Sequence, residues 1–422
     1  MIELSRDYAE RLDRDDELAP LREQFVIADE DLLYMDGNSL GRLPRNAAAK
    51  AQRLVEHEWG ETLIGGWNRG WYEAPLRVGD TIGSLIGAAA GQVAVTDSTS
   101  VNLYKLVIAA LRLRPGRHRI VTDTLNFPSD YYIIQGAIDL LSAGHDLVRA
   151  GSRDGGVTAD VDELVRSIDS DTALIVLSHV AFRSGYLYDV QRITQAAHAE
   201  GALIIWDLSH SVGALPIELD GCKADFAVGC TYKYLNGGPG APAFLYVNRA
   251  LQETAASPIW GWFGRETPFA FDPDYAPARG IVRFLAGTPP ILSLLTMEAA
   301  LEPTVGAGIA AIRRKSVSQT EYLIALIDLL LSPLGFELAS PRNPAQRGSH
   351  VSVRHNECYR IAQALTAELN VIPDFREPDI IRFGCAPLYT TYVDIWETVQ
   401  RTRRVIADRL FETYSATRHG VT

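Results

Sequence analysis

Three polar residues near the middle of the chain have the types and spacing needed for Schiff-base chemistry. Asp207 ends a short apolar run that starts at Leu203, His210 follows three residues later, and Lys233 lies in a polar, glycine-rich stretch. Such a run is typical of a buried parallel strand, although a run this short also fits a buried helix. A carboxylate at the carboxyl end of a strand lies where open α/β sheets bind ligands. A lysine in such a pocket can lose its proton and attack a carbonyl group.

Pyridoxal phosphate requires this combination of groups, together with a phosphate cradle. Lys233 is the candidate Schiff-base lysine, Asp207 can hold a proton on the ring nitrogen, and His210 can orient the carboxylate. Taken alone, these residues leave a plainer interpretation open, because acids at strand ends are commonly caps and lone lysines are commonly exposed. The neighbours of the lysine, Tyr232, Tyr234 and a glycine run, favour the cofactor.

Other segments fit a phosphate, a planar ring and a carboxylate. Thr99 and Ser100 precede a predicted apolar helix, where hydroxyl and N–H groups can bind an anion, although simple N-capping would explain them equally well. Phe127 precedes another predicted helix and could stack on a cofactor ring or belong to the core. Arg382 follows an apolar pair and could hold a carboxylate in bidentate fashion, although a surface ion pair is the commoner role.

Composition limits the partners of the chain. Its 422 residues, 47% hydrophobic and 22% charged, are enough for two domains in an ordinary soluble protein. A net charge of −12 without a basic cluster argues against nucleic acid. The four cysteines form no close pair and the N-terminus has no apolar core, which together predict a cytoplasmic location. The longest apolar stretch, 322–331, is too short to span a membrane, and we predict no metal site.

Strand-like and helical segments alternate between residues 78 and 247, which predicts a mainly parallel sheet with helices on both faces. The tail, 336–414, mixes short strands and helices and resembles a smaller α+β domain. We also predict an N-terminal segment, 1–55, that packs with the small domain, a large cofactor-binding domain, 56–300, and a small C-terminal domain, 301–422.

Rival functions also have support in the sequence. Gly37, Ser39 and Gly41 have the spacing of a nucleophile elbow, which would make the protein a serine hydrolase that uses Ser39. Only one weak strand precedes that serine, so a glycine-rich turn approaching a ligand or helix is better supported. A cysteine desulfurase or lyase with the same cofactor would need a loop cysteine, for which Cys358 is the candidate. A non-catalytic binding module would not need Lys233.

The order of these motifs resembles the kynureninases, pyridoxal-phosphate enzymes of the aspartate aminotransferase fold type (fold type I). The matching segments are DGNSLG (36–41), FPSD (127–130), DLSH (207–210), YKYLN (232–236), GWFG (261–264) and RFGCAPLY (382–389). They extend over nearly the whole chain, and FPSD, YKYLN and GWFG in this order are the most specific. The resemblance implies an α/β fold with a mainly parallel seven-stranded sheet and a smaller α+β domain.

The resemblance also implies a role for each matched position. The implied cofactor contacts are Thr99, Ser100, Phe127, Asp130, Ser178, Asp207, His210, Tyr232, Lys233, Trp262 and Thr288. The implied substrate contacts are Asn38, His57, Gly287 and Arg382, with Arg382 on the α-carboxylate and His57 near the aromatic ring. Trp262 and Thr288 would reach the cofactor phosphate of the other subunit, which implies a homodimer.

The activity implied by the resemblance is hydrolytic cleavage of the Cβ–Cγ bond of L-kynurenine to anthranilate and L-alanine. Lys233 would move the α-proton while Asp207 keeps the cofactor ring an electron sink, and Tyr232 would relay a proton at the carbonyl group. Gly287 and Thr288 depart from the Ser-Asn pair of animal members. That departure points to L-kynurenine as the substrate, with 3-hydroxykynurenine left open.

Overall fold

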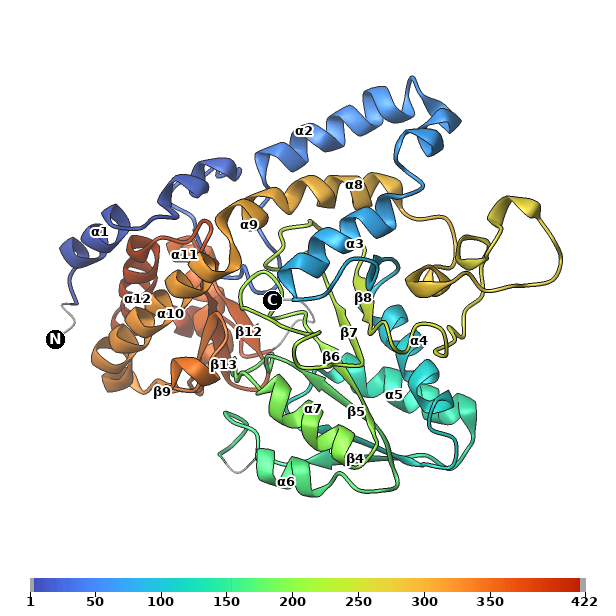
Figure 1. Cartoon of the computed structure of the whole chain (residues 1–422). Coiled ribbons are helices and arrows are strands. Elements are labelled where there is room, and N and C mark those ends of the chain that lie inside the picture. The colour runs from blue at the N-terminus through green and yellow to red at the C-terminus, as the bar shows by residue number, and fades with distance from the viewer. Residues whose placement is uncertain (1–3, 153, 418–422) are drawn as a thin grey trace.

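A seven-stranded sheet forms the centre of the computed structural model, which describes residues 4–152 and 154–417 (Figure 1). The strand order is β2-β8-β7-β6-β5-β3-β4, with β2 Val93–Val95, β3 Arg119–Asp123, β4 Asp146–Ala150, β5 Thr172–Ser178, β6 Leu203–Asp207, β7 Phe226–Gly229 and β8 Phe244–Val247. The five strands from β7 to β4 run parallel, whereas β8 is antiparallel to both β7 and β2. The predicted α/β fold with a mainly parallel seven-stranded sheet is confirmed.

The hydrophobic pattern of the sequence predicts the inner strands of the sheet but not the edge strand β4. Every residue of β5 and β6 is buried, as expected for parallel strands covered on both faces. In the edge strand β4, Asp146 and Arg149 are exposed and only Ala150 is buried. Polar edges discourage pairing with other chains, so β4 lacks the apolar run that makes the inner strands predictable.

Helices cover both faces of the sheet, and alternate residues of each strand contact them. Ile204 and Trp206 of β6 pack in one hydrophobic cluster with α3, α6 and α7, whereas Leu203 and Ile205 pack in another with α4 and α5. The alternation arises because successive side chains of a strand point to opposite faces. These helices are α3 Ala74–Leu85, α4 Thr99–Arg112, α5 Pro128–Leu141, α6 Val161–Arg166 and α7 Val190–Ala199.

A four-stranded antiparallel sheet, on the left in Figure 1, forms a second unit. Its order is β12-β13-β10-β9, with β9 Glu337–Leu338, β10 His350–Arg354, β12 Asp374–Arg376 and β13 Ile380–Gly384. Apolar residues of α10 (Ile309–Leu326), α11 (Cys358–Leu369) and α12 (Tyr392–Ala407) share one cluster with this sheet. The domain boundaries at residues 55 and 300 stay predictions.

The remaining elements connect the two units or lie on their surfaces. Their bounds are α1 Arg6–Arg14, β1 Leu33–Tyr34, α2 Arg45–Arg53, α8 Ile291–Ala300, α9 Glu302–Ala307 and β11 Val371–Ile372, with short 3-10 or π turns at Ala19–Gln24, Leu54–Trp59, Leu63–Arg69, Trp262–Gly264, Pro268–Ala270, Gly280–Phe284, Ile327–Leu331, Ser332–Leu334, Pro344–Gln346 and Leu410–Thr413. Strand β1 pairs in parallel with β11, and α2 lies along α8 (Figure 1).

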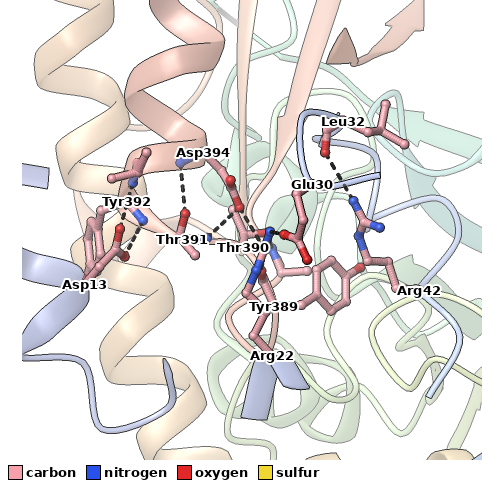
Figure 2. Close-up of polar contacts among 12 residues, drawn as sticks. Asp13, Arg22, Glu30, Leu32, Arg42, Tyr389, Thr390, Thr391, Tyr392 and Asp394 are labelled. Carbon is pink, nitrogen blue, oxygen red and sulfur yellow. Dashed lines mark hydrogen bonds and ion pairs between the residues drawn. The ribbon is translucent and has the colours of Figure 1, made fainter. Parts of the chain in front are cut away.

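Polar contacts attach the N-terminal segment to the start of α12 (Figure 2). The carboxylate of Asp13 accepts hydrogen bonds from the backbone N–H groups of Tyr392 (2.7 Å) and Val393 (3.0 Å). These groups have no partner inside the helix because they belong to its first turn. Arg22 donates to Asp394 at 3.1 Å, so the N-terminal segment and the second unit share their polar contacts as well as their core.

The helical stretch Ile309–Leu334 is, by length and composition, apolar enough to cross a membrane. It differs from a membrane span in its contacts, because it supplies Leu323, Leu326 and Ile327 to the core of the second unit. It also carries Lys315, whose Nζ lies 2.7 Å from Asp16, and both side chains are 6% exposed. The stretch is thus a core helix with a buried ion pair.

Replacing Asp16 by alanine should destabilise the second unit. A buried charge without its partner is costly, so we expect Asp16→Ala to lower the free energy of unfolding by about 3 kcal/mol. Urea denaturation would measure the change. Glu17→Ala is the control, since Glu17 and Arg314 pair on the surface with side chains 60% and 64% exposed, and it should cost less than about 1 kcal/mol. Equal losses of unfolding free energy in Asp16→Ala and Glu17→Ala would contradict the assignment of Asp16 and Lys315 as a stabilising buried ion pair.

Candidate active site

The carboxyl ends of neighbouring strands bring the predicted residues to one edge of the large sheet. Asp207 is the last residue of β6 and pairs in register with Ser178, the last residue of β5. After β7 the chain turns so that Nζ of Lys233 lies 2.9 Å from Nε2 of His210. The same Nζ lies 5.9 Å from the centre of the Phe127 ring. The lysine, acid, histidine and aromatic ring are thus brought together.

One oxygen of Asp207 is held in place and the other is available. Oδ1 accepts hydrogen bonds from the N–H (2.8 Å) and the hydroxyl (2.6 Å) of Ser209. Burial raises the pKa of Asp207, and the Ser209 hydrogen bonds and the charge of Lys233 oppose that rise. Ser209 therefore has the orienting role that the sequence assigns to His210, which contacts Lys233 instead. No described residue donates a hydrogen bond to Oδ2 of Asp207.

Asp130, in the first turn of α5, is a second buried acid near Asp207. It is 3% exposed, and its Oδ2 has no hydrogen-bond partner among the described residues. Burial and the negative charge of Asp207 raise the pKa of Asp130 well above its usual value, and the charge of Lys233 opposes that shift. A cationic group at this edge would relieve the repulsion between the two carboxylates.

Asn126 connects two of the predicted residues, and sequence reasoning overlooked it. Its Oδ1 accepts hydrogen bonds from the N–H (3.0 Å) and hydroxyl (2.6 Å) of Ser178 and from the N–H of Phe127 (3.0 Å). The Phe127 ring is 40% exposed and meets Phe182 edge-on at 5.2 Å. The position of Asn126 between a strand and a helix start was its only signal in the sequence.

The start of α4 carries more hydroxyl groups than capping requires. Ser98 is the N-cap and accepts from the N–H of Val101 at 3.4 Å. Thr99 and Ser100 therefore need not cap the helix, and the Ser100 hydroxyl lies 3.2 Å from that of Ser129 in the first turn of α5. Two helix N-termini meet at this point, an arrangement that suits an anion.

The groups that flank Lys233 are neutral. Burial, and next the charge of Lys233, lower the pKa of His210 well below its usual value. The ring of Tyr232 lies 6.0 Å from Nζ of Lys233, and the nearby Cys230 thiol and partial burial raise the pKa of its hydroxyl group. Tyr232 thus keeps its proton and can donate it.

Arg382, the predicted carboxylate clamp, is 1% exposed and already holds a carboxylate. Its Nε donates to Oδ2 of Asp374 at 2.6 Å, and its Nη2 contacts the same oxygen. Nη1 donates to the carbonyl of Phe182, and Nη2 donates to the hydroxyl of Ser39 at 3.0 Å. The amide oxygen of Asn38, oriented by its hydrogen-bonding pattern, lies 3.2 Å from Nη2. Burial lowers the pKa of Arg382 to about 10, so the group stays charged at neutral pH.

The glycine-rich turn at residues 37–41 approaches the lysine closely and does not resemble a nucleophile elbow. The described hydrogen bonds of Ser39 connect it to Asp374, Arg376 and Arg382, without a histidine that could act as base. The N–H of Gly41 donates to the carbonyl of Tyr232 at 2.8 Å. A Cβ atom at Gly41 would overlap the carbonyl of Lys233, so the hydrolase alternative is not favoured.

The cysteine that a desulfurase would need is also unsuitable. Cys358 is fully buried at the start of α11, where burial raises the pKa of its thiol to about 12. A persulfide acceptor has to be an accessible thiolate.

Four of the predicted site residues lie away from the Lys233 of their own chain. The side chain of His57 is 58% exposed and bonds Glu61 at 2.8 Å. Trp262 packs on neighbouring aromatic rings, while Gly287 and Thr288 are exposed. In the part of the chain that the structure describes, none of the four makes a hydrogen bond or ring contact with Lys233.

Known proteins show which family the site belongs to. The chain is 46% identical over 407 residues to a kynureninase of Burkholderia pseudomallei (strain 1106a), covering 95% of each chain. It is 45% identical over 417 residues to a kynureninase of Pseudomonas fluorescens, covering 97% of this chain and 98% of the relative. The chain belongs to the kynureninase family. A family model described as the kynureninase C-terminal domain matches residues 312–402, within the second unit.

Solved structures share the fold of this kynureninase-family chain. A cysteine desulfurase from Thermococcus onnurineus NA1 matches with a TM-score of 0.79 at 18% identity, covering 92% of this chain and 98% of the other. A protein described with glycine covalently linked to its PLP cofactor matches with a TM-score of 0.77 at 17% identity, covering 93% and 99%. At such identities the matches establish fold type I, not the reaction.

The residues at the sheet edge fit pyridoxal phosphate, the cofactor expected of a kynureninase. Lys233 could bind the aldehyde carbon, the exposed face of Phe127 could stack on the ring, and Oδ2 of Asp207 could hold the ring N–H. The unpaired oxygen of Asp130 and the hydroxyl groups at the start of α4 are polar groups that a bound cofactor would satisfy.

Replacing Asp130 by asparagine should stabilise the cofactor-free protein at neutral pH. The folded-state pKa of Asp130 is raised, so the folded chain holds this proton more tightly and loses stability as pH rises above the unfolded value of 3.8. Urea denaturation near pH 7 should show a gain of about 1 kcal/mol or more for Asp130→Asn, which shrinks toward pH 4. Asp139 is an exposed acid on the same helix, so Asp139→Asn should leave the free energy of unfolding unchanged at both pH values. A gain in Asp130→Asn that does not depend on pH would contradict this reasoning.

Proposed function

We propose that the chain hydrolyses the Cβ–Cγ bond of L-kynurenine to anthranilate and L-alanine, with pyridoxal phosphate carried on Lys233. The observation that carries the proposal is the 2.9 Å contact between Lys233 and His210 at the sheet edge that also holds Asp207 and Phe127. The names of the relatives, both kynureninases, and the PLP cofactor of one structural neighbour support it.

Each residue at the edge has one task in this reaction. Bound pyridoxal phosphate would supply an electron sink for the electron pair left at the substrate α-carbon. Lys233 takes up and returns the proton at that carbon, since the neutral His210 beside it does not compete for a positive charge. Asp207 holds a proton at the ring nitrogen, and Tyr232 donates its proton at the side-chain carbonyl.

The substrate carboxylate meets a guanidinium pair at the junction of the two sheets. Arg382 is held by Asp374, so the incoming carboxylate shares its donors with Ser39 and Asn38. Arg376 is beside them, and its Nε is buried without a hydrogen-bond partner in the described structure. Arg376 also pairs with Asp374 at 3.1 Å and donates to Ser39 at 3.2 Å, so it adds positive charge beside Arg382.

We further propose a homodimer in which Trp262 and Thr288 contact the cofactor phosphate of the partner subunit. The segment 257–290 includes the yellow projection at the right of Figure 1. It carries large exposed apolar side chains, since Trp260 is 65% exposed, Phe269 63% and Phe271 79%. Such exposure is unusual unless another surface covers it. His57 and Gly287 would meet the aromatic end of the substrate in that assembly, with L-kynurenine preferred.

Two coarser proposals accompany this function. A cytoplasmic location is supported by the four cysteines, all of which are unpaired thiols. The division into 1–55, 56–300 and 301–422 is supported by the separate hydrophobic clusters of the large sheet and the second unit.

The lysine assignment is tested by absorbance and product analysis. Purified protein supplied with pyridoxal phosphate should absorb in the visible, and borohydride should fix the cofactor on Lys233. Lys233→Ala should lose the covalent adduct and slow anthranilate release by roughly a thousand-fold or more. A reducible adduct in the variant would refute the assignment. Sulfide release from L-cysteine without anthranilate from L-kynurenine would instead favour a desulfurase.

Asp207→Asn should affect turnover more than binding. The carboxylate acts on charge that develops during the reaction, so we expect kcat to fall about a hundred-fold or more with KM within a few-fold. Asp225→Asn is the control, because Asp225 is a buried acid at the opposite end of the strands that bonds His198 and the N–H of Ile204. A rise in KM at constant kcat would contradict the role of Asp207.

A further inference from the structure

His350, at the start of β10, is a fully buried histidine with neither ring nitrogen hydrogen-bonded among the described residues. In the antiparallel pairing of β10 with β13, His350 is opposite Gly384 and Ser352 is opposite Arg382. Paired residues share a face and alternate residues return to it. His350 therefore projects from the same face of the small sheet as the guanidinium that is proposed to bind the substrate carboxylate.

His210, which follows strand β6 of the large sheet, packs against this face of the small sheet. The rings of His350 and His210 are 5.7 Å apart between centroids, with 57° between their planes. His210 also contacts Lys233 through Nε2, at 2.9 Å. Its other nitrogen, Nδ1, is buried and has no hydrogen-bond partner in the described structure. In the described structure, both ring nitrogens of His350 and Nδ1 of the neighbouring His210 are thus buried without hydrogen-bond partners.

Gly185, in the large unit, lies close to His350. Its φ of +73° lies in the left-handed region, and a Cβ there would lie 2.9 Å from the carbonyl oxygen of His350 and 3.3 Å from its Nε2. The backbone of the large unit therefore packs closely against this imidazole.

Both imidazoles are neutral. Burial lowers the pKa of each well below its usual value, and Lys233, Arg382 and Arg376 face both rings and add to the shift. The carbonyl of Phe182 faces His350 and opposes the shift, but its geometry does not complete a hydrogen bond. A neutral imidazole has one donor and one acceptor, so the two rings are complementary partners.

We propose that His350 is a positioning residue that hydrogen-bonds, directly or through one water molecule, to Nδ1 of His210. The bond keeps the proton of His210 on Nδ1, which leaves Nε2 as an acceptor facing Lys233. Buried polar atoms are rarely left unpaired, and a contact beyond direct hydrogen-bond range is commonly closed by water. The inference rests on the proposed function only in treating Lys233 as the cofactor-bearing amine.

The consequence concerns the charge on Lys233. An acceptor at Nε2 of His210 favours the protonated form of the Lys233 Schiff base. Without His350, the proton of His210 would move to Nε2, and the protonated lysine nitrogen would lose its partner. The loss of one hydrogen bond of ordinary strength to a charged group corresponds to a change of about one pH unit in the midpoint at which that group titrates.

The tautomer can be read directly in the full-length, cofactor-free protein. In 15N spectra of labelled histidine side chains, assigned with His210→Gln, we expect wild-type His210 to carry its proton on Nδ1. His350→Leu should move that proton to Nε2, whereas His350→Gln, which retains a donor and an acceptor, should keep it on Nδ1. His355→Gln is the control, because His355 is a half-buried histidine of the same unit that packs on Phe336.

A second measurement uses the loaded protein. The midpoint at which the visible band of the Lys233 Schiff base titrates should fall by about one pH unit in His350→Leu and should be restored in His350→Gln. A wild-type His210 with its proton on Nε2, or an unchanged midpoint in His350→Leu, would overturn the proposal. If His350→Leu does not fold, the wild-type and His350→Gln spectra still decide. Absence of any visible band in the wild type would count against the proposed function and leave the tautomer result valid.

Discussion

The buried positive charge of Arg382 is the constraint on which the junction of the two units depends. Moving a charged group out of water costs on the order of several kcal/mol per ion unless partners surround it. Those partners come from three separate segments: Asp374 from the neighbouring strand, Phe182 from the large unit and Ser39 from the N-terminal turn. The three segments must therefore converge for this guanidinium to be buried at all.

The site is electrically divided, and the division orients an amino-acid substrate. Asp207 and Asp130 place two carboxyl groups where the cofactor ring nitrogen is expected, whereas Arg382 and Arg376 place positive charge at the other end. Lys233 is between these ends and influences the pKa of both acids. A zwitterion with an aromatic ketone side chain has only one favourable orientation in such a field.

Local patterns predicted the parts of the site whose position follows from the strands. Asp207 and Lys233 follow buried apolar runs, and the carboxyl ends of parallel strands meet at one edge, so their approach could be predicted from the sequence. Asp374 could not be found that way, because its partner Arg382 is opposite it across the β12–β13 hairpin. Recognition of that hairpin would have revealed the pair. His350 gave no signal, since a lone histidine in a strand is indistinguishable from a core residue.

The glycine-rich turn has a mechanical consequence. At one end of this segment β1 pairs with β11, and the carbonyl of Met35 accepts from the N–H of Gly384 at 2.7 Å, while at the other end Gly41 is bonded to Tyr232. One short stretch of backbone is therefore attached both to the second unit and to the loop that carries Lys233. A relative motion of the two units would therefore act on both attachments of this stretch. Such a motion would be transmitted through Gly41 and Tyr232 to the loop that carries Lys233.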